Sequence, residues 1–347
     1  MKVRDYVWPL IGITAVIVST WLLYHEIRNL SLGDIVASLE AIPWQRWVLA
    51  AGATAVAYVA LAGYDRIALA HLGKRMSWPF VTLCSFTTYA LAHNIGASVF
   101  SGAVVRYRAY TSRGMTATEV GILVALCSFT FVLGTVELSG LVLLLEPGLV
   151  ARFVDDVPRG LVIGVGIALL GLVALHVLGS WMHLKPFRVG SFELAYPRLP
   201  IVLRQLLIGP LELIGAAGII YFALPGDAHP SFLVVLGIFL ASYTAALLSH
   251  APGGLGILEI VFVTGLPDVD PADVLAALIV FRLFYLLVPF ALSLLLILLF
   301  ERAEFVRRKL WSERSGQDGP KGVDAVDCPG RRQVRVSPGP DGPACGA

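Results

Sequence analysis

The sequence has 347 residues, of which 57% are hydrophobic and 14% are charged, and its mean hydropathy is +0.79. Soluble domains carry about 25% charged residues, so this composition excludes an ordinary soluble globular protein and also a disordered chain. The 26 basic residues nearly balance the 24 acidic ones. Because no segment forms a basic domain, nucleic acid is not an expected partner.

The four cysteines form neither a disulfide framework nor a metal site. Cys84 and Cys127 lie inside apolar runs, whereas Cys328 and Cys345 lie in a tail rich in glycine and proline. Their spacing matches no metal-binding pattern, and no cofactor motif stands elsewhere in the sequence. We therefore expect no metal and no cofactor.

Eight apolar segments follow one another along the chain, and the longer ones reach the roughly 20 residues that a membrane-spanning helix needs. They cover residues 7–24, 47–69, 79–100, 119–145, 160–182, 200–224, 231–249 and 274–300. The first follows Lys2 and Arg4 as a signal peptide would, but it is long for one and no small-residue cleavage site follows, so we predict a retained span. A short amphipathic helix over 31–39 is expected on the membrane surface.

This order predicts an all-α polytopic membrane protein with an integral membrane domain over 1–310. The tail over 312–347 is rich in glycine, proline, serine and charge and lacks apolar periodicity. Such a segment cannot bury enough apolar surface to offset the entropy of ordering. We predict that it is disordered and cytoplasmic.

Two of the apolar segments carry or adjoin helix breakers, and both breaks read His-x-x-Gly. The first is His93-Asn94-Ile95-Gly96, and the second runs from His250 through Pro252, Gly253 and Gly254 to Gly256. Cytoplasmic loops are enriched in Lys and Arg. If all eight segments cross the membrane, twelve loop Lys and Arg residues lie inside and nine outside; if each break is the tip of a re-entrant hairpin, the numbers are seventeen and four. The charge distribution favours two hairpins.

The lengths of the two segments that precede the breaks bear on whether each forms a half-helix or a full span. The 14 residues 79–92 make a half-helix of about 21 Å, but the 19 residues 231–249 make about 28 Å and nearly cross, so an arrangement with one hairpin stays open. With two hairpins, the first half (1–150) and the second half (158–310) have the same order of elements in opposite orientation. This is the inverted-repeat plan of many transporters, in which discontinuous helices meet near the midplane.

Backbone breaks at membrane depth are tolerated only inside protein or beside water. We therefore interpret His93, Asn94 and His250 as parts of a substrate site, the alternative being surface loops that join ordinary helices. The basic residues Arg106, Arg108 and Arg113 follow the first break; they either gather anionic headgroups or simply anchor the cytoplasmic side.

Ionisable residues inside the spans are costly and should face a cavity or one another. They are Asp65, Arg66, Glu137, His176, Glu212, Glu259 and Arg282. Arg282 either holds a lipid phosphate or forms an ion pair with Glu137 or Glu259. Asp65 and Arg66 are expected to snorkel or to pair locally. His176 and Glu212 are expected to make interhelical hydrogen bonds.

The residues also resemble the lysylphosphatidylglycerol synthase transmembrane family, the membrane part of the multiple peptide resistance factor and of the stand-alone YbhN-like proteins. The resemblance covers roughly residues 7–310 and is most specific in Pro252-Gly253-Gly254-Leu255-Gly256-Ile257-Leu258-Glu259 followed by Arg282-Leu283. It also includes the stretch 30–44 and the first break with Gly102 and Arg106. The first break has Ser101-Gly102 where the family has a fuller Gly-Gly pattern.

This resemblance implies a lipid flippase. It implies that the residues lining or shaping the lipid site are Asn94, Gly96, Arg106, Pro252, Gly253, Gly254, Gly256, Glu259 and Arg282, to which the residues themselves add His93, Arg108, Glu137 and His250. In the full-length synthase a separate cytoplasmic domain attaches the amino acid, and residues 301–347 are too few for such a domain.

No nucleophile, base and orienting group occur in a recognised catalytic pattern, so we expect a transporter and not an enzyme. The expected partners are membrane phospholipids. The expected location is the inner or plasma membrane with both termini cytoplasmic, and the oligomeric state stays open, with a homodimer as one candidate. The alternatives are a membrane scaffold that presents lipid or a partner to another enzyme, and a small-solute transporter.

Overall fold

The computed structural model describes residues 32–95, 98–182, 187–189, 192–194, 196–225, 230–249 and 256–296. Several predictions fall outside these residues. They concern the span at 7–24, the tail at 312–347, and the tips of the two breaks, which contain Gly96, His250, Pro252, Gly253 and Gly254.

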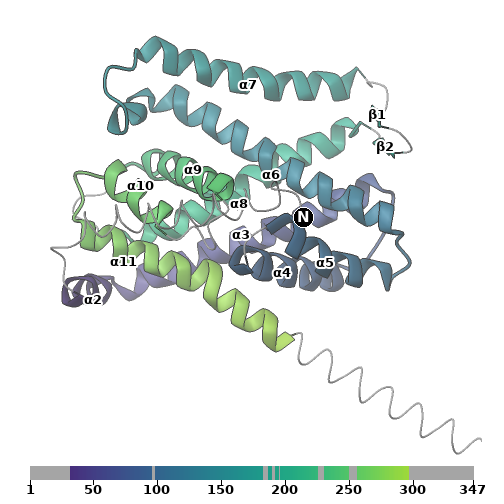
Figure 1. The fold of residues 1–347 in the computed structure, drawn as a ribbon, viewed down its shortest axis with the longest axis horizontal. Helices are drawn as coiled ribbons and strands as arrows, with labels where there is room; N and C mark the ends of the chain where they lie inside the picture. Colours follow the sequence, from purple (N-terminus) through teal and green to yellow (C-terminus); the bar gives the residue numbers. More distant parts are fainter. Residues whose placement is uncertain are drawn as a thin grey trace, which may run out of the picture. The chain divides into compact units, whose positions relative to one another are not determined.

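The described chain is predominantly helical (Figure 1). Its helices are α2 (Leu32–Ala41), α3 (Trp44–His71), α4 (Trp78–Ile95), α5 (Ser98–Thr111), α6 (Ala117–Leu145), α7 (Arg159–Trp181), α8 (Leu199–Ala223), α9 (Phe232–Ser249), α10 (Ile257–Gly265) and α11 (Pro271–Phe281), with a short 3₁₀ helix at Pro147–Arg152. A π-helical turn over Arg282–Leu287 follows α11, and the helix continues to Leu296.

Six of the described helices are long and apolar enough to cross a membrane. They are α3, α6, α7, α8, α9 and the helix Pro271–Leu296. A polytopic helical membrane protein is therefore confirmed, whereas the eight predicted segments are not all matched by spans: the segment 79–100 is divided between α4 and α5, neither of which is among the six. The predicted amphipathic helix at 31–39 corresponds to α2.

Local sequence signals account for several helix starts. At α6, the Thr116 hydroxyl accepts a hydrogen bond from the Glu119 amide at 3.2 Å, and the Glu119 carboxylate accepts one from the Thr116 amide at 2.9 Å. This reciprocal cap satisfies two amides that the helix itself cannot. At α11, the Asp270 carboxylate accepts from the Ala272 amide at 2.8 Å. Helix α10 begins after Gly256, whose φ of 79° is a left-handed conformation that suits glycine.

Helices α3, α6 and α8 cross at very short range. A Cβ atom on Gly134 of α6 would lie 2.5 Å from the Gly209 carbonyl carbon of α8, and one on Gly215 of α8 would lie 2.8 Å from the Ala57 amide nitrogen of α3. Small residues let helix backbones approach this closely in a membrane. Of the α8 span 61% is buried, against 17% for α7, so α8 lies in the core and α7 at the periphery.

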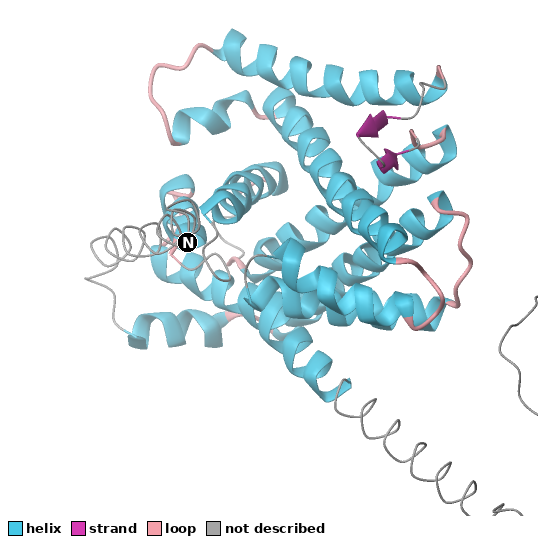
Figure 2. Ribbon diagram, turned by 45° about the vertical axis from the view of Figure 1, so that its right-hand side comes forward, coloured by secondary structure: helices cyan, strands magenta, loops and turns pink. Residues whose placement is uncertain are grey.

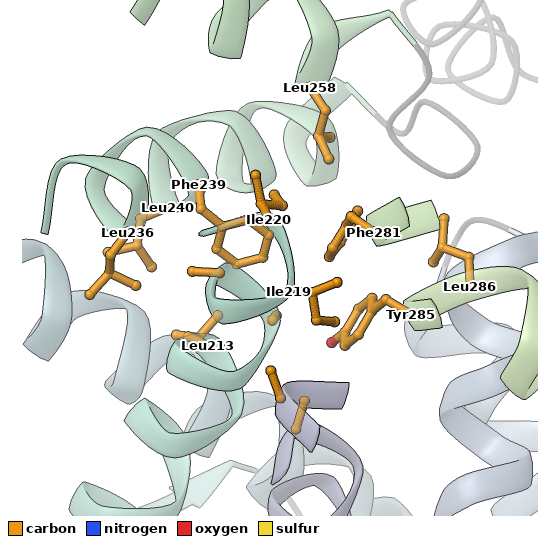
Figure 3. Packing of buried hydrophobic residues seen from close by; sticks show 14 of the residues in the cluster. Leu213, Ile219, Ile220, Leu236, Phe239, Leu240, Leu258, Phe281, Tyr285 and Leu286 are labelled. Carbon is orange, nitrogen blue, oxygen red and sulfur yellow. The ribbon is translucent and has the colours of Figure 1, made fainter. Parts of the chain in front are cut away.

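The apolar core extends from α8 to α9 and α11 (Figure 3). There the rings of Phe239, Phe281 and Tyr285 lie beside Ile219 and Ile220. Phe281 and Tyr285 are stacked, with centroids 5.1 Å apart. The last turn of α11 and the π turn therefore pack on the middle of the protein and not on its edge.

Two pairs of helices flank the breaks, and one of these helices, α9, is itself long enough to cross a membrane. Helices α4 and α5 pack against each other on either side of residues 96–97, and α9 and α10 do so on either side of residues 250–255 (Figure 1). Helix α4 continues to Ile95, so His93 and Asn94 belong to its last turn and the first break comes later than predicted.

A two-stranded hairpin was not predicted. Strands Phe187–Val189 (β1) and Phe192–Leu194 (β2) pair antiparallel near the ends of α7 and α8 (Figure 2). These six residues are an exception in a chain whose described part is otherwise helical, and the all-α fold class is confirmed. The physical reason is visible in the sequence, where short β-prone stretches flank Gly190-Ser191, a turn-type pair.

Candidate functional site

The π turn Arg282–Leu287 interrupts a helix that runs from Pro271 to Leu296. Side chains from two other helices donate to its carbonyl groups. The Tyr58 hydroxyl of α3 lies 3.0 Å from the Tyr285 carbonyl oxygen, and the Asn94 Nδ2 of α4 lies 3.1 Å from the Leu286 carbonyl oxygen. Such turns often mark functional sites, because the regular hydrogen-bond ladder is broken there. The π turn is thus held by α3 and by the end of α4 beside the first break.

Helix α10, which follows the second break, contacts the same turn through an ion pair. Arg282 Nε lies 3.0 Å from Glu259 Oε1, and Arg282 Nη2 also contacts this oxygen. The other carboxylate oxygen of Glu259 accepts from the Gly256 amide at 2.8 Å. Of the two interpretations left open for Arg282, the structure shows the ion pair, and its acid is Glu259 and not Glu137.

His93 joins the site from the first break. Its ring stacks on the ring of Tyr285, with centroids 5.0 Å apart and an interplanar angle of 20°. Its Nδ1 is buried and has no hydrogen-bond partner among the described residues. His93, Asn94, Glu259 and Arg282 are therefore brought together around one turn.

A second ion pair is buried away from the π turn. Arg106 Nη2 lies 2.6 Å from Asp65 Oδ1, and the Tyr110 hydroxyl donates to Asp65 Oδ2 at 2.8 Å. The Cys127 thiol lies 3.3 Å from Oδ1, and the Arg106 guanidinium lies 4.7 Å from the centroid of the Tyr89 ring. Asp65 is fully buried, so the expectation that it snorkels or pairs locally is wrong.

The basic cluster after the first break is accordingly divided. Arg106 faces the interior, because it compensates the charge of Asp65. Arg108 and Arg113 are exposed, and the Arg113 guanidinium lies 4.5 Å from the centroid of the Phe80 ring. Arg66 makes the local contacts expected of it, donating to the Met76 carbonyl oxygen at 2.7 Å.

Glu212 lies in a third polar cluster. The Tyr285 hydroxyl donates to its Oε1, and the Tyr64 hydroxyl lies 3.4 Å from its Oε2 and 3.3 Å from the Gly209 carbonyl oxygen. These bonds confirm the interhelical hydrogen bonding predicted for Glu212. His176 Nδ1 lies 2.7 Å from the hydroxyl of Tyr196, which precedes α8 and is not in a helix. This hydrogen bond is therefore not the interhelical one predicted for His176.

Glu137 is not brought into any of these clusters. Its Oε2 is buried and has no hydrogen-bond partner in the part of the chain that the structure describes. The tyrosines of the site carry no motif that would have singled them out. Their one signal is position: Tyr58 and Tyr64 stand within an apolar run, whereas membrane tyrosines concentrate at the interfaces.

Comparisons with known proteins place the chain in a family. Residues 10–293 match the family described as the lysylphosphatidylglycerol synthase TM region. The uncharacterized protein slr0712 of Synechocystis is 28% identical over 320 residues, which cover 91% of this chain and 98% of that protein. The inner membrane protein YbhN of Escherichia coli is 28% identical over 268 residues, which cover 75% of this chain and 82% of YbhN.

The chain also matches one part of larger enzymes. The phosphatidylglycerol lysyltransferase of Staphylococcus aureus is 25% identical over 279 residues, which cover 79% of this chain but 32% of the enzyme. The family match itself spans most of the chain, including both breaks and the π turn. This protein therefore belongs to the lysylphosphatidylglycerol synthase transmembrane family.

Proposed function

We propose that this protein moves phospholipids between the leaflets of the cell membrane, with the headgroup bound at the π turn. The observation that carries the proposal is that helices beside both breaks meet this turn, through Asn94 at the end of α4 and through the Glu259–Arg282 pair from α10. Charged groups at membrane depth commonly mark substrate pathways. The names of the staphylococcal relatives point to phosphatidylglycerol, an anionic lipid.

The ion pair supplies a mechanism for binding and release. The guanidinium of Arg282 matches the geometry of a phosphate as well as that of a carboxylate. A lipid phosphate that enters the site displaces Glu259 from Arg282, and the pair forms again when the lipid leaves. Because the cation always has an anionic partner, it is never left uncompensated in the membrane.

An inverted repeat would give this site alternating access. The order α3, α4 with α5, and α6 is repeated as α8, α9 with α10, and the helix Pro271–Leu296. Helices related by an in-plane two-fold axis run antiparallel, and the α3–α8 contacts fit this: Gly63 meets Ile208 at one end, and Ala53 meets Gly218 at the other. Rocking of the two halves would expose the π turn to each leaflet in turn.

The test is transbilayer lipid movement in proteoliposomes. Fluorescent phosphatidylglycerol and other labelled lipids are incorporated, and dithionite reports the protected inner pool. We expect the protein to remove this protected pool. The double variant Glu259→Gln with Arg282→Gln removes the cation without leaving a lone charge, and it should slow lipid movement by about tenfold or more, as expected for a lost charge-assisted bond.

The matched control is Arg152→Gln, which removes the last residue's charge from the 3₁₀ helix Pro147–Arg152 and its 3.5 Å pair with the exposed Asp268, and which should leave the rate unchanged. Equal rates for wild type and the double variant would contradict a phosphate site at Arg282. Absence of any protein-dependent movement would favour a membrane scaffold instead, a role that fits the finding that Arg106 and Arg282 both have acidic partners.

A further inference from the structure

Three acidic residues of the protein's interior differ in how their charge is compensated. Asp65 pairs with Arg106, and Glu259 pairs with Arg282. Glu212 is 1% exposed, and its hydrogen-bond partners among the described residues are two tyrosine hydroxyls. A buried carboxylate ordinarily needs a cation, and hydroxyl donors alone do not neutralise it.

Glu212 also lies near the middle of its span. It is 13 residues after Leu199 and 11 residues before Ala223, which correspond to about 20 Å and 17 Å along α8. Within membranes, an acidic residue at this depth with no cation beside it is typical of proton relays.

The titratable groups that face Glu212 are all tyrosines in the described part of the chain. They are Tyr58 and Tyr64 of α3, Tyr243 of α9, and Tyr285 of the π turn. The other helices packed against α8 contribute Cys127 and Glu137 from α6 and His176 from α7, none of which interacts with Glu212. His93 stacks on the Tyr285 ring.

We propose that Glu212 is a proton-binding site, and that its proton is exchanged with the aqueous phase as the π turn rearranges. The second part rests on the proposed lipid movement, whereas the first does not. The step is simple: the carboxylate takes up one proton from water to become a carboxylic acid, and releases it again.

Tyr285 connects this proton to the lipid site. An ionised carboxylate accepts hydrogen bonds on both oxygens, whereas a carboxylic acid has one oxygen converted to a donor. Uptake of the proton therefore weakens the bonds from Tyr285 and Tyr64. Because Tyr285 is part of the π turn and its own carbonyl is held by Tyr58, a change at Glu212 changes how firmly the turn is held beside Arg282.

The first experiment detects the proton directly and needs no lipid movement. Infrared difference spectra of the full-length protein in nanodiscs are recorded across a pH series. We expect a titrating carboxylic acid band that is lost in Glu212→Gln and kept in Glu137→Gln, the matched variant at another membrane carboxylate. A band that persists unchanged in Glu212→Gln overturns the proposal.

If Glu212→Gln does not fold, Tyr285→Phe and Tyr64→Phe decide the question, because they keep the carboxyl group and remove its hydroxyl donors. Each should shift the frequency of the band, and a band that neither variant shifts overturns the assignment.

The second experiment measures the rate of lipid movement as a function of pH. Wild type should depend on pH and Glu212→Gln should have the same rate at every pH.

The two proposals fail differently. A Glu212-dependent band without lipid movement by wild type leaves the proton site standing and overturns the proposed function. Lipid movement with the same pH dependence in wild type and Glu212→Gln overturns the coupling while the lipid role stands.

Discussion

Arg106 Nη2 lies 2.6 Å from Asp65 Oδ1, although the two residues are 41 positions apart in the sequence and both are buried. The pair joins α3 to α5, the helix after the first break, and Tyr110 and Cys127 complete the surroundings of the carboxylate. It therefore fixes how α5 packs on α3.

Breaking this pair should strongly destabilise the protein. Removal of one partner leaves a buried charge, which costs about 3–5 kcal/mol, so Asp65→Ala and Arg106→Ala should each lower the thermal unfolding temperature in detergent markedly. The control is Lys74→Ala, at a more exposed pair with Glu119 of similar length, 2.8 Å, where a much smaller effect is expected because water screens the charges. Equal effects at the two pairs would contradict the structural role given to Asp65–Arg106.

The crossing of α6 and α8 should not tolerate a methyl group. Gly209→Ala places a Cβ 2.8 Å from the Thr130 carbonyl oxygen, and overpacking of this kind costs about 1–3 kcal/mol. Gly121→Ala, on the same α6 but with nothing within 4 Å, should be neutral or slightly stabilising because alanine favours a helix. Thermal unfolding of the two variants distinguishes a close crossing from a loose one.

The π turn should become more mobile when a side chain that donates a hydrogen bond to its carbonyl groups is removed. Tyr58→Phe deletes the hydroxyl that bonds the Tyr285 carbonyl oxygen, a loss of about 1 kcal/mol, and amide hydrogen exchange over 282–287 should become faster. Tyr107→Phe, at an exposed tyrosine, is the control and should leave the exchange unchanged. Protection at 282–287 that is the same in both variants would show that Tyr58 does not hold the turn.

We expect Asn94 to support lipid movement through the hydrogen bond of its side-chain amide and not through its volume. Asn94→Leu keeps a similar volume but removes the bond to the Leu286 carbonyl oxygen, so lipid movement should fall several-fold while the protein stays folded. Ser112→Ala, which loses only a local bond to Ala109 on an exposed turn, should move lipid like wild type. A normal rate in Asn94→Leu would remove the first break from the site.

The sequence predicts the helices well, because a long apolar run in a bilayer can satisfy its backbone hydrogen bonds in few ways other than a helix. It also singles out Asn94 and Glu259 as polar residues at membrane depth, and the structure brings both to the π turn. It does not predict which acid pairs with which arginine. Glu137 and Glu259 have the same chemistry, and only the packing of α10 beside the π turn selects Glu259.

The burial of Arg106 could not be predicted for a related reason. In the sequence it belongs to a run with Arg108 that has the composition of a cytoplasmic anchor. Residues two apart on a helix point to different faces, and α5 turns Arg106 inward and Arg108 outward. The π turn itself has no sequence signature here, since Arg282 to Leu287 reads as ordinary helix.

The most direct test of the lipid site is the rate of headgroup exposure in proteoliposomes for wild type and for the charge-swapped variant Glu259→Arg with Arg282→Glu. The swap preserves an ion pair between α10 and the π turn but moves the cation off the turn. The account predicts a folded variant in which lipid movement falls by about tenfold or more. A folded swap that moves lipid at the wild-type rate would contradict it and leave the pair with a purely structural role.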